Sequence, residues 1–167
     1  MIDPNIFNVA LKTALVLTLI YLAYIDWRSF LLPNSITIPL MFSGILLNCV
    51  SELRLAYPVD AIIGAFLGYA ILWSLNSGYR LFSHRNGIGM GDAKLLAALG
   101  AWFGFGALAK ILLISSLLGV IGGLIWLKWN RHHLTQAFPF GPFLAIAGII
   151  ELLCPQIIPT LPLTKLI

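Results

Sequence analysis

Long apolar stretches separated by short polar ones dominate the chain. Breaks at charged residues and at clusters of Pro and Gly leave six apolar segments, at residues 5–26, 36–53, 59–77, 93–109, 111–129 and 138–157. A helix that crosses the hydrocarbon core of a bilayer needs roughly 20 such residues. We therefore predict an all-α, polytopic integral membrane protein with about six transmembrane helices.

Composition supports a membrane protein rather than a soluble one. Of the 167 residues, 60% are hydrophobic and only 10% are charged, which is too little polar surface to cover a domain in water. The net charge of +4 comes from basic residues scattered near the ends of apolar segments, a pattern typical of lipid contact and topology control. We expect one membrane-embedded domain over residues 1–167, with lipid and not nucleic acid around it.

The ends of the segments suggest how the helices begin and pack. The first segment lacks a basic n-region and is followed by Asp26, Trp27 and Arg28 instead of a small-residue cleavage site, so we expect a retained helix. The fourth segment ends beside Lys110 and predicts a tight helical hairpin with the fifth. Glycines in these two segments are expected to let helix backbones approach closely: Gly100, Gly104, Gly106, Gly119, Gly122 and Gly123.

The distribution of Lys and Arg predicts an orientation. With the N-terminus outside, six fall on the inner side: Arg28, Arg80, Arg85, Lys94, Lys128 and Arg131. Four fall on the outer side: Lys12, Arg54, Lys110 and Lys165. Because cytoplasmic loops carry the excess of basic residues, this bias favours both termini outside.

Two of the six acidic residues fall at the inner ends of predicted helices. Asp26 closes the first apolar segment, and Asp92 stands at the start of the fourth. Asp92 lies within the polar stretch from Asn76 to Lys94, where we expect function to concentrate. The other four, Asp3, Glu52, Asp60 and Glu151, fall toward the outer face. Ionisable groups at membrane depth are costly and are candidates for function.

A pair of carboxylates at one level indicates acid–base chemistry. Two close carboxylates cannot both ionise easily and therefore share one proton. The ionised member can take a proton from water while the protonated member polarises a carbonyl group. The sequence does not say which aspartate plays which part. Taken singly, Asp92 also suits a helix N-cap, and Asp26 also suits an ion pair with Arg28 or with a neighbouring helix.

The residues around Asp92 change this balance. Residues 87–94 read Gly-Ile-Gly-Met-Gly-Asp-Ala-Lys, and such glycines let a backbone lie close to an extended peptide. The pattern resembles the GxGD signature of polytopic membrane aspartyl proteases. The longer run over residues 89–104, GMGDAKLLAALGAWFG, resembles the type IV prepilin peptidases in particular.

Two further stretches resemble the same family. Residues 26–34, DWRSFLLPN, are similar to its first aspartate motif, and residues 139–145, PFGPFLA, to the segment that opens its last helix. The resemblance implies Asp26 and Asp92 as the catalytic pair. It assigns supporting places in the motifs to Gly89, Gly91, Lys94, Arg28, Pro33 and Asn34. We interpret Lys94 as a residue that orients or tunes Asp92. Pro142 is expected to begin a helix, because Pro fits the first helical position without steric strain.

The resemblance also implies an activity and a location. The family cleaves type IV prepilins, or the pseudopilins of type II secretion systems, after a Gly on the cytoplasmic side of the bacterial inner membrane, with no cofactor. Many members also carry a cytoplasmic domain with two C-x-x-C pairs that is associated with N-methylation. This sequence has no such pair, so we expect a short, peptidase-only form whose methyltransferase activity is doubtful.

Other interpretations remain open. A small proton-coupled transporter would explain two intramembrane acids, and an inactive pilin-binding assembly factor would explain the resemblance without catalysis. Cys49 and Cys154 stand alone in or beside apolar runs and are expected to be buried thiols. His84, His132 and His133 suit polar loops, so we expect no metal. Nothing in the sequence indicates an oligomeric state.

Overall fold

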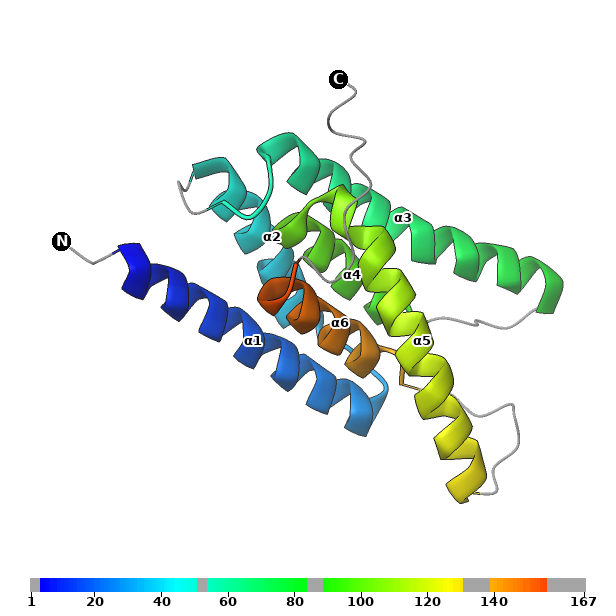
Figure 1. Ribbon diagram of the computed structural model, residues 1–167. Helices are drawn as coiled ribbons and strands as arrows, with labels where there is room; N and C mark the ends of the chain where they lie inside the picture. The colour runs from blue at the N-terminus through cyan, green and yellow to red at the C-terminus, as the bar shows by residue number, and fades with distance from the viewer. Residues whose placement is uncertain (1–3, 51–53, 84–88, 131–138, 156–167) are drawn as a thin grey trace.

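The structure is a computed structural model and describes residues 4–50, 54–83, 89–130 and 139–155. These ranges contain six helices, in the order α1 (Pro4–Ser29), α2 (Asn34–Val50), α3 (Pro58–Ser83), α4 (Met90–Phe103), α5 (Phe105–Asn130) and α6 (Gly141–Leu153) (Figure 1). The predicted all-α fold with six apolar segments is confirmed. Several predictions concern residues outside the described ranges: Asp3, Glu52, His84, Arg85, Arg131, His132, His133 and Lys165.

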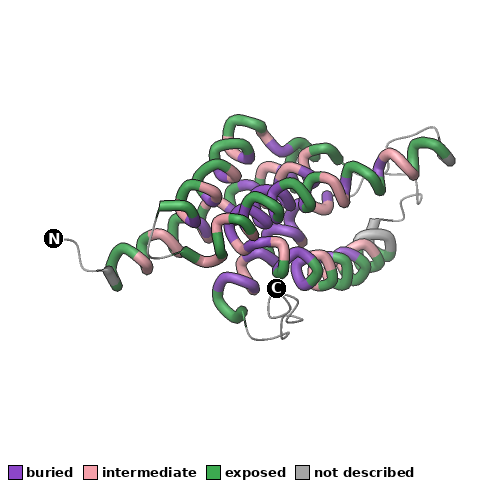
Figure 2. Tube along the Cα trace, turned by 90° about the horizontal axis from the view of Figure 1, so that it is seen from above, coloured by how far each residue is buried: buried purple, intermediate pink, exposed green. Residues whose placement is uncertain are grey.

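Helix α4 is the centre of the bundle. From Asp92 to Trp102 every residue except Lys94 is buried, and α4 contacts α2, α3, α5 and α6. Figure 2 shows the buried residues gathered in the middle of the molecule. A helix that is apolar on all sides is stable only where protein or lipid surrounds it, and here the surroundings are the other helices. The run Leu95–Leu99 supplies this all-round apolar surface, because each of its residues is almost fully buried.

Glycines set how closely α3 approaches this central helix. A Cβ atom on Gly64 would collide with the carbonyl oxygen of Gly100, and a Cβ on Gly100 would collide with that of Gly64. Such contacts let helices pack where lipid offers no hydrophobic driving force. Gly119 and Gly122 serve the same purpose against phenylalanine rings of the last helix segment. The prediction for Gly106 is wrong, because a Cβ there would meet no atom within 4 Å.

Three helices are long and apolar enough to cross a membrane, with spans at Asn5–Ser29, Pro58–Leu81 and Phe105–Ile125. Only 17% to 28% of their most apolar windows is buried inside the bundle, so apolar side chains cover the outside, as lipid requires. Helices α4 and α6, with 14 and 13 residues, reach only about 20 Å at 1.5 Å per residue. They are shorter than the hydrocarbon core and lie among the longer helices.

Several boundaries differ from those predicted. The break between the fourth and fifth segments lies at Gly104 and not at Lys110, because Gly104 has a φ of 80° and ends α4. Few other residues adopt this left-handed conformation without strain. Lys110 therefore lies within α5. The polar stretch after Asn76 is also helical up to Ser83, since α3 continues through it.

Both cysteines are free, and the prediction that they are buried is wrong, because Cys49 and Cys154 are exposed. In a membrane protein an apolar run can face lipid as well as the protein core. Apolar neighbours in the sequence therefore do not establish burial within the bundle.

Buried polar side chains tie the helices together at the end where α1 begins. The Asn48 amide donates to the carbonyl oxygens of Ala101 and Trp102 at 2.9 and 3.0 Å, and its oxygen accepts from the N–H groups of Leu55 and Ala56 at 2.8 and 3.0 Å. All hydrogen-bonding positions of this amide are thus used.

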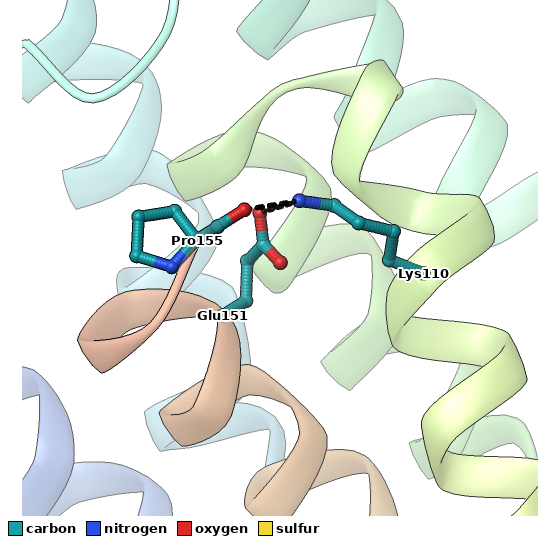
Figure 3. A network of polar contacts seen from close by, with 3 residues as sticks. All are labelled: Lys110, Glu151 and Pro155. Atoms are coloured by element: carbon teal, nitrogen blue, oxygen red, sulfur yellow. Dashed lines mark hydrogen bonds and ion pairs between the residues drawn. The ribbon is translucent and has the colours of Figure 1, made fainter. Parts of the chain in front are cut away.

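A buried ion pair links α5 to α6 near the same end. The Lys110 ammonium lies 2.6 Å from Oε1 of Glu151 and donates to the carbonyl oxygen of Pro155 at 3.0 Å (Figure 3). Both side chains are nine-tenths buried or close to it. An unpaired charge buried there would destabilise the fold, so each side chain compensates the charge of the other.

The other end of the bundle collects the motifs. Helices α1, α3 and α5 end there, and α2, α4 and α6 begin there, as Figure 1 shows. The basic residues predicted on the inner side and described by the structure follow this division: Arg28, Arg80 and Lys128 lie in the last turns of α1, α3 and α5, and Lys94 in the start of α4. Arg54 and Lys110 lie toward the opposite end.

Candidate active site

Asp26 and Asp92 line the same cavity, although 66 positions separate them in the sequence. Asp26 projects from the last turns of α1 and Asp92 from the first turn of α4. Their exposed fractions are 4% and 7%, so both carboxyl groups are largely removed from solvent. The cavity has a volume of about 450 Å³. Two acids from distant parts of the chain thus meet at one end of the bundle.

Asp26 is held by the beginning of α6. The backbone N–H of Gly141, the first residue of that helix, donates to Oδ2 of Asp26 at 3.0 Å. The N-terminus of a helix presents unpaired N–H groups and a positive partial charge, both of which suit a carboxylate. A Cβ atom at this position would lie 2.6 Å from Oδ2 of Asp26, so only glycine allows the contact without displacement.

Asp92 lies in the first turn of α4, outside the three helices long enough to cross a membrane. Burial, followed by the negative charge of Asp26, raises the pKa of Asp92 to about 7, while the backbone of Gly89 acts in the opposite direction. The charge of Asp26 thus adds to burial in disfavouring ionisation of Asp92. Asp92 therefore keeps its proton at a pH where most carboxyl groups have lost theirs.

The N-cap interpretation of Asp92 is wrong. Helix α4 begins after Gly89, and no side chain caps it. The backbone N–H of Asp92 donates to the carbonyl oxygen of Gly89 at 3.1 Å. The Asp92 carboxyl interacts with the backbone of Gly89 and lines the cavity beside it. The ion-pair alternative for Asp26 also fails, because Asp26 forms no ion pair with the residues that the structure describes. The Arg28 guanidinium lies over the Tyr24 ring, 5.4 Å from its centroid.

The two aspartate motifs pack directly against each other. A Cβ atom on Gly91 would lie 2.8 Å from Cβ of Leu32, so glycine lets the segment after α1 approach the start of α4. Beside this contact, Nζ of Lys94 donates to Oδ1 of Asn34 at 2.6 Å. An ammonium group can only donate, so it fixes the Asn34 oxygen toward Lys94. This hydrogen bond joins α2 to α4 at the edge of the cavity.

One lining residue has an unusual backbone conformation. Phe30 follows the last residue of α1 with a φ of 55°, and its N–H donates to the carbonyl oxygen of Asp26 at 2.9 Å. A residue in this position ends a helix in the left-handed region, where glycine is usual. For a residue with a Cβ the conformation costs on the order of 1 kcal/mol or more.

Most of the residues singled out from the sequence come together here. The cavity is lined by Asp26, Phe30, Leu31, Leu32, Pro33, Asn34, Gly89, Met90, Gly91, Asp92 and Lys94. Arg28 is not among them. The Lys94 ammonium contacts Asn34 and not Asp92. The predicted role of Lys94 in orienting Asp92 therefore has to act through Asn34 and not through a direct contact.

Two features of this site were not predicted. The first concerns the Pro-Phe-Gly-Pro-Phe segment. Its prediction as a helix start is confirmed, because Pro142 lies in the first turn of α6, but its contact with Asp26 was not foreseen. The contact of Gly141 with Asp26 spans 115 positions, and no local pattern reveals it. The second feature is the backbone conformation of Phe30, because the residue type gives no sign of a positive φ.

Comparison with known proteins agrees with these motifs. Residues 13–124 match the family described as the type IV leader peptidase family, Peptidase_A24. A prepilin leader peptidase/N-methyltransferase from Aeromonas salmonicida is 48% identical over 143 residues, which cover 84% of this chain and 48% of the relative. A protein of the same name from Dickeya chrysanthemi is 43% identical over 132 residues, covering 78% of this chain and 46% of the relative.

The chain spans about half the length of these curated relatives. No solved structure matches it. The family match covers well over half of the chain and includes both Asp26 and Asp92. On these grounds this helical membrane protein belongs to the type IV leader peptidase family.

Proposed function

We propose that this chain is a membrane aspartic endopeptidase that removes the leader peptide of type IV prepilins or type II secretion pseudopilins, with Asp26 and Asp92 as its catalytic pair. The observation that carries the proposal is the shared cavity: two buried carboxyl groups line it, and the charge of one acts on the other. In this proposal residues 1–167 act as one peptidase domain.

The surroundings of the two carboxyl groups favour different roles. Asp26 accepts a hydrogen bond from a helix N-terminus, which suits the ionised member of the pair. The pKa of Asp92 is raised to about 7, so a large share of this carboxyl is still protonated near neutral pH. We therefore assign Asp26 as the general base and Asp92 as the general acid.

The reaction then proceeds in two steps. A water molecule attacks the carbonyl carbon of the scissile bond, Asp26 takes one of its protons, and the Asp92 proton goes to the carbonyl oxygen. As the C–O double bond re-forms, that proton returns to the pair, the C–N bond breaks, and the leaving nitrogen receives a proton from the pair. Both carboxyl groups return to their starting states.

The location of the substrate follows from the same geometry. Both acids lie at the end of the bundle where α1, α3 and α5 carry basic residues in their last turns. Because such residues accumulate on the cytoplasmic side, we place the active site at the cytoplasmic face of the bacterial inner membrane. A precursor with a membrane-embedded apolar segment and a short basic leader would present its cleavage site, after a Gly, at this level.

Replacement of each aspartate tests the proposal. Asp26→Asn and Asp92→Asn should each abolish leader cleavage of a candidate prepilin in membranes or detergent, because each removes one half of the proton transfer. Asp60→Asn is the matched control, since Asp60 lies in the first turn of α3 at the opposite end. Unimpaired cleavage by either catalytic variant would refute the mechanism. Retained pilin assembly in both variants would instead indicate a binding factor.

A further inference from the structure

Phe30 is the only non-glycine residue with a positive φ in the part of the chain that the structure describes. It occupies the position just after α1, where glycine would end the helix without steric strain. Its backbone is nonetheless fixed there, because its N–H bonds to the carbonyl oxygen of Asp26. A strained residue persists only where the surrounding structure holds it, and such residues cluster at functional sites.

Phe30 lines the cavity that Asp26 and Asp92 share. Its exposed fraction is 45%, so much of the residue is not packed in the core. Leu31 and Met90 line the same cavity and are 73% and 37% exposed. The cavity therefore combines the acidic pair with an apolar surface contributed by both aspartate motifs.

We propose that Phe30, together with Leu31 and Met90, binds a large apolar side chain of the substrate within one or two residues of the cleaved bond. Phe30 is then a specificity-determining residue, and the inference rests on the proposed peptidase function. Successive side chains of an extended peptide point to opposite sides. When the scissile carbonyl lies between the carboxyl groups, a neighbouring side chain reaches this apolar surface.

Peptide binding to an inactive protein tests this without requiring cleavage. Two precursor peptides would differ only in carrying Leu or Ala at the two positions after the scissile bond. We expect Asp92→Asn protein to bind the Leu peptide about 10-fold more tightly, as an apolar pocket discriminates between side chains of these sizes. Adding Phe30→Gly should remove this preference, and adding Phe30→Leu should keep most of it.

Two controls separate specificity from a general structural effect. Trp27→Ala removes an exposed aromatic side chain that is not among the residues lining the cavity, and it should leave the preference intact. Thermal unfolding of Phe30→Gly should occur at an unchanged or higher temperature, because glycine relieves the backbone strain. A loss of preference with normal stability therefore reports on the pocket.

The outcomes also distinguish the inference from the function on which it rests. If the Leu preference survives Phe30→Gly, the inference is overturned, even where wild-type protein cleaves both peptides. If Phe30→Gly removes the preference in binding while wild-type protein cleaves neither peptide, the pocket assignment stands and the proposed peptidase function fails. In an active enzyme the same loss should appear mainly as a higher KM for the Leu peptide.

Discussion

The backbone N–H of Gly141 and Oδ2 of Asp26 lie 3.0 Å apart, so the beginning of the last helix holds a carboxyl group at the end of the first. Helices α1 and α6 pack along each other, which keeps the donor and acceptor in register. The site therefore depends on three separate parts of the chain: the end of α1, the start of α4 and the start of α6.

Replacement of Gly141 by Ala should displace Asp26. The added Cβ would lie 2.6 Å from Oδ2 and 2.9 Å from Cγ of Asp26. A misplacement of about 1 Å in a catalytic group costs roughly 100-fold in rate, and we expect a loss of that order in kcat for leader cleavage. Gly106→Ala is the control, because its Cβ meets no atom within 4 Å. Equal activity of the two variants would argue against the positioning role of Gly141.

The acid role of Asp92 predicts a pH dependence. Its pKa of about 7 implies that kcat/KM for cleavage falls as the pH rises through about 7, because the required proton is then lost. A pH–rate profile measured in detergent or vesicles checks this. An activity that stays constant from pH 6 to well above pH 8 would contradict the assignment.

The same pKa predicts a change in stability. The folded protein holds the Asp92 proton up to about pH 7, whereas an ordinary carboxyl with a pKa of 3.8 has lost it. This contribution to stability is fully present below about pH 4 and is lost as the pH rises through about 7. As the pH rises through this range, the Tm of the wild type should therefore fall relative to the Tm of Asp92→Asn. A difference that does not depend on pH would rule out the raised pKa.

The hydrogen bond between Lys94 and Asn34 predicts coupled effects on cleavage. Lys94→Met and Asn34→Ala each remove the 2.6 Å bond that ties the two aspartate motifs together. We expect each variant to slow cleavage about 10-fold, and the double variant to be no slower than either one, since residues in one contact are not additive. Additive losses would show that the two side chains act separately. Unchanged cleavage by Lys94→Met would remove Lys94 from the mechanism.

The ion pair between Lys110 and Glu151 predicts an effect on stability, in which a second substitution recovers what the first one loses. Lys110→Met leaves the Glu151 carboxylate buried without its partner, which typically costs about 3–5 kcal/mol. Combining it with Glu151→Leu removes both charges and should restore most of the loss. Thermal unfolding of the single and double variants tests this. If the double variant is as unstable as Lys110→Met, the pair does not act through charge compensation.

Periodicity, composition and motifs by themselves determine much of this protein. Six apolar segments predict six helices, because the backbone of a chain in lipid must satisfy its own hydrogen bonds. The family motifs single out Asp26 and Asp92, and the distribution of Lys and Arg assigns them to one end of the molecule. These inferences are local: each depends on residues a few positions apart or on a count along the chain.

Tertiary structure decides what such patterns leave open. Gly141 reaches Asp26 across 115 positions, and Lys94 reaches Asn34 across 60, through packing that no local pattern encodes. The exposure of Cys49 and Cys154 depends in the same way on which helix faces meet lipid. Phe30 has a positive φ and lines a cavity that residues from α1, α2 and α4 form together, which its residue type does not reveal. Sequence thus determines which groups are present, and packing determines which of them touch.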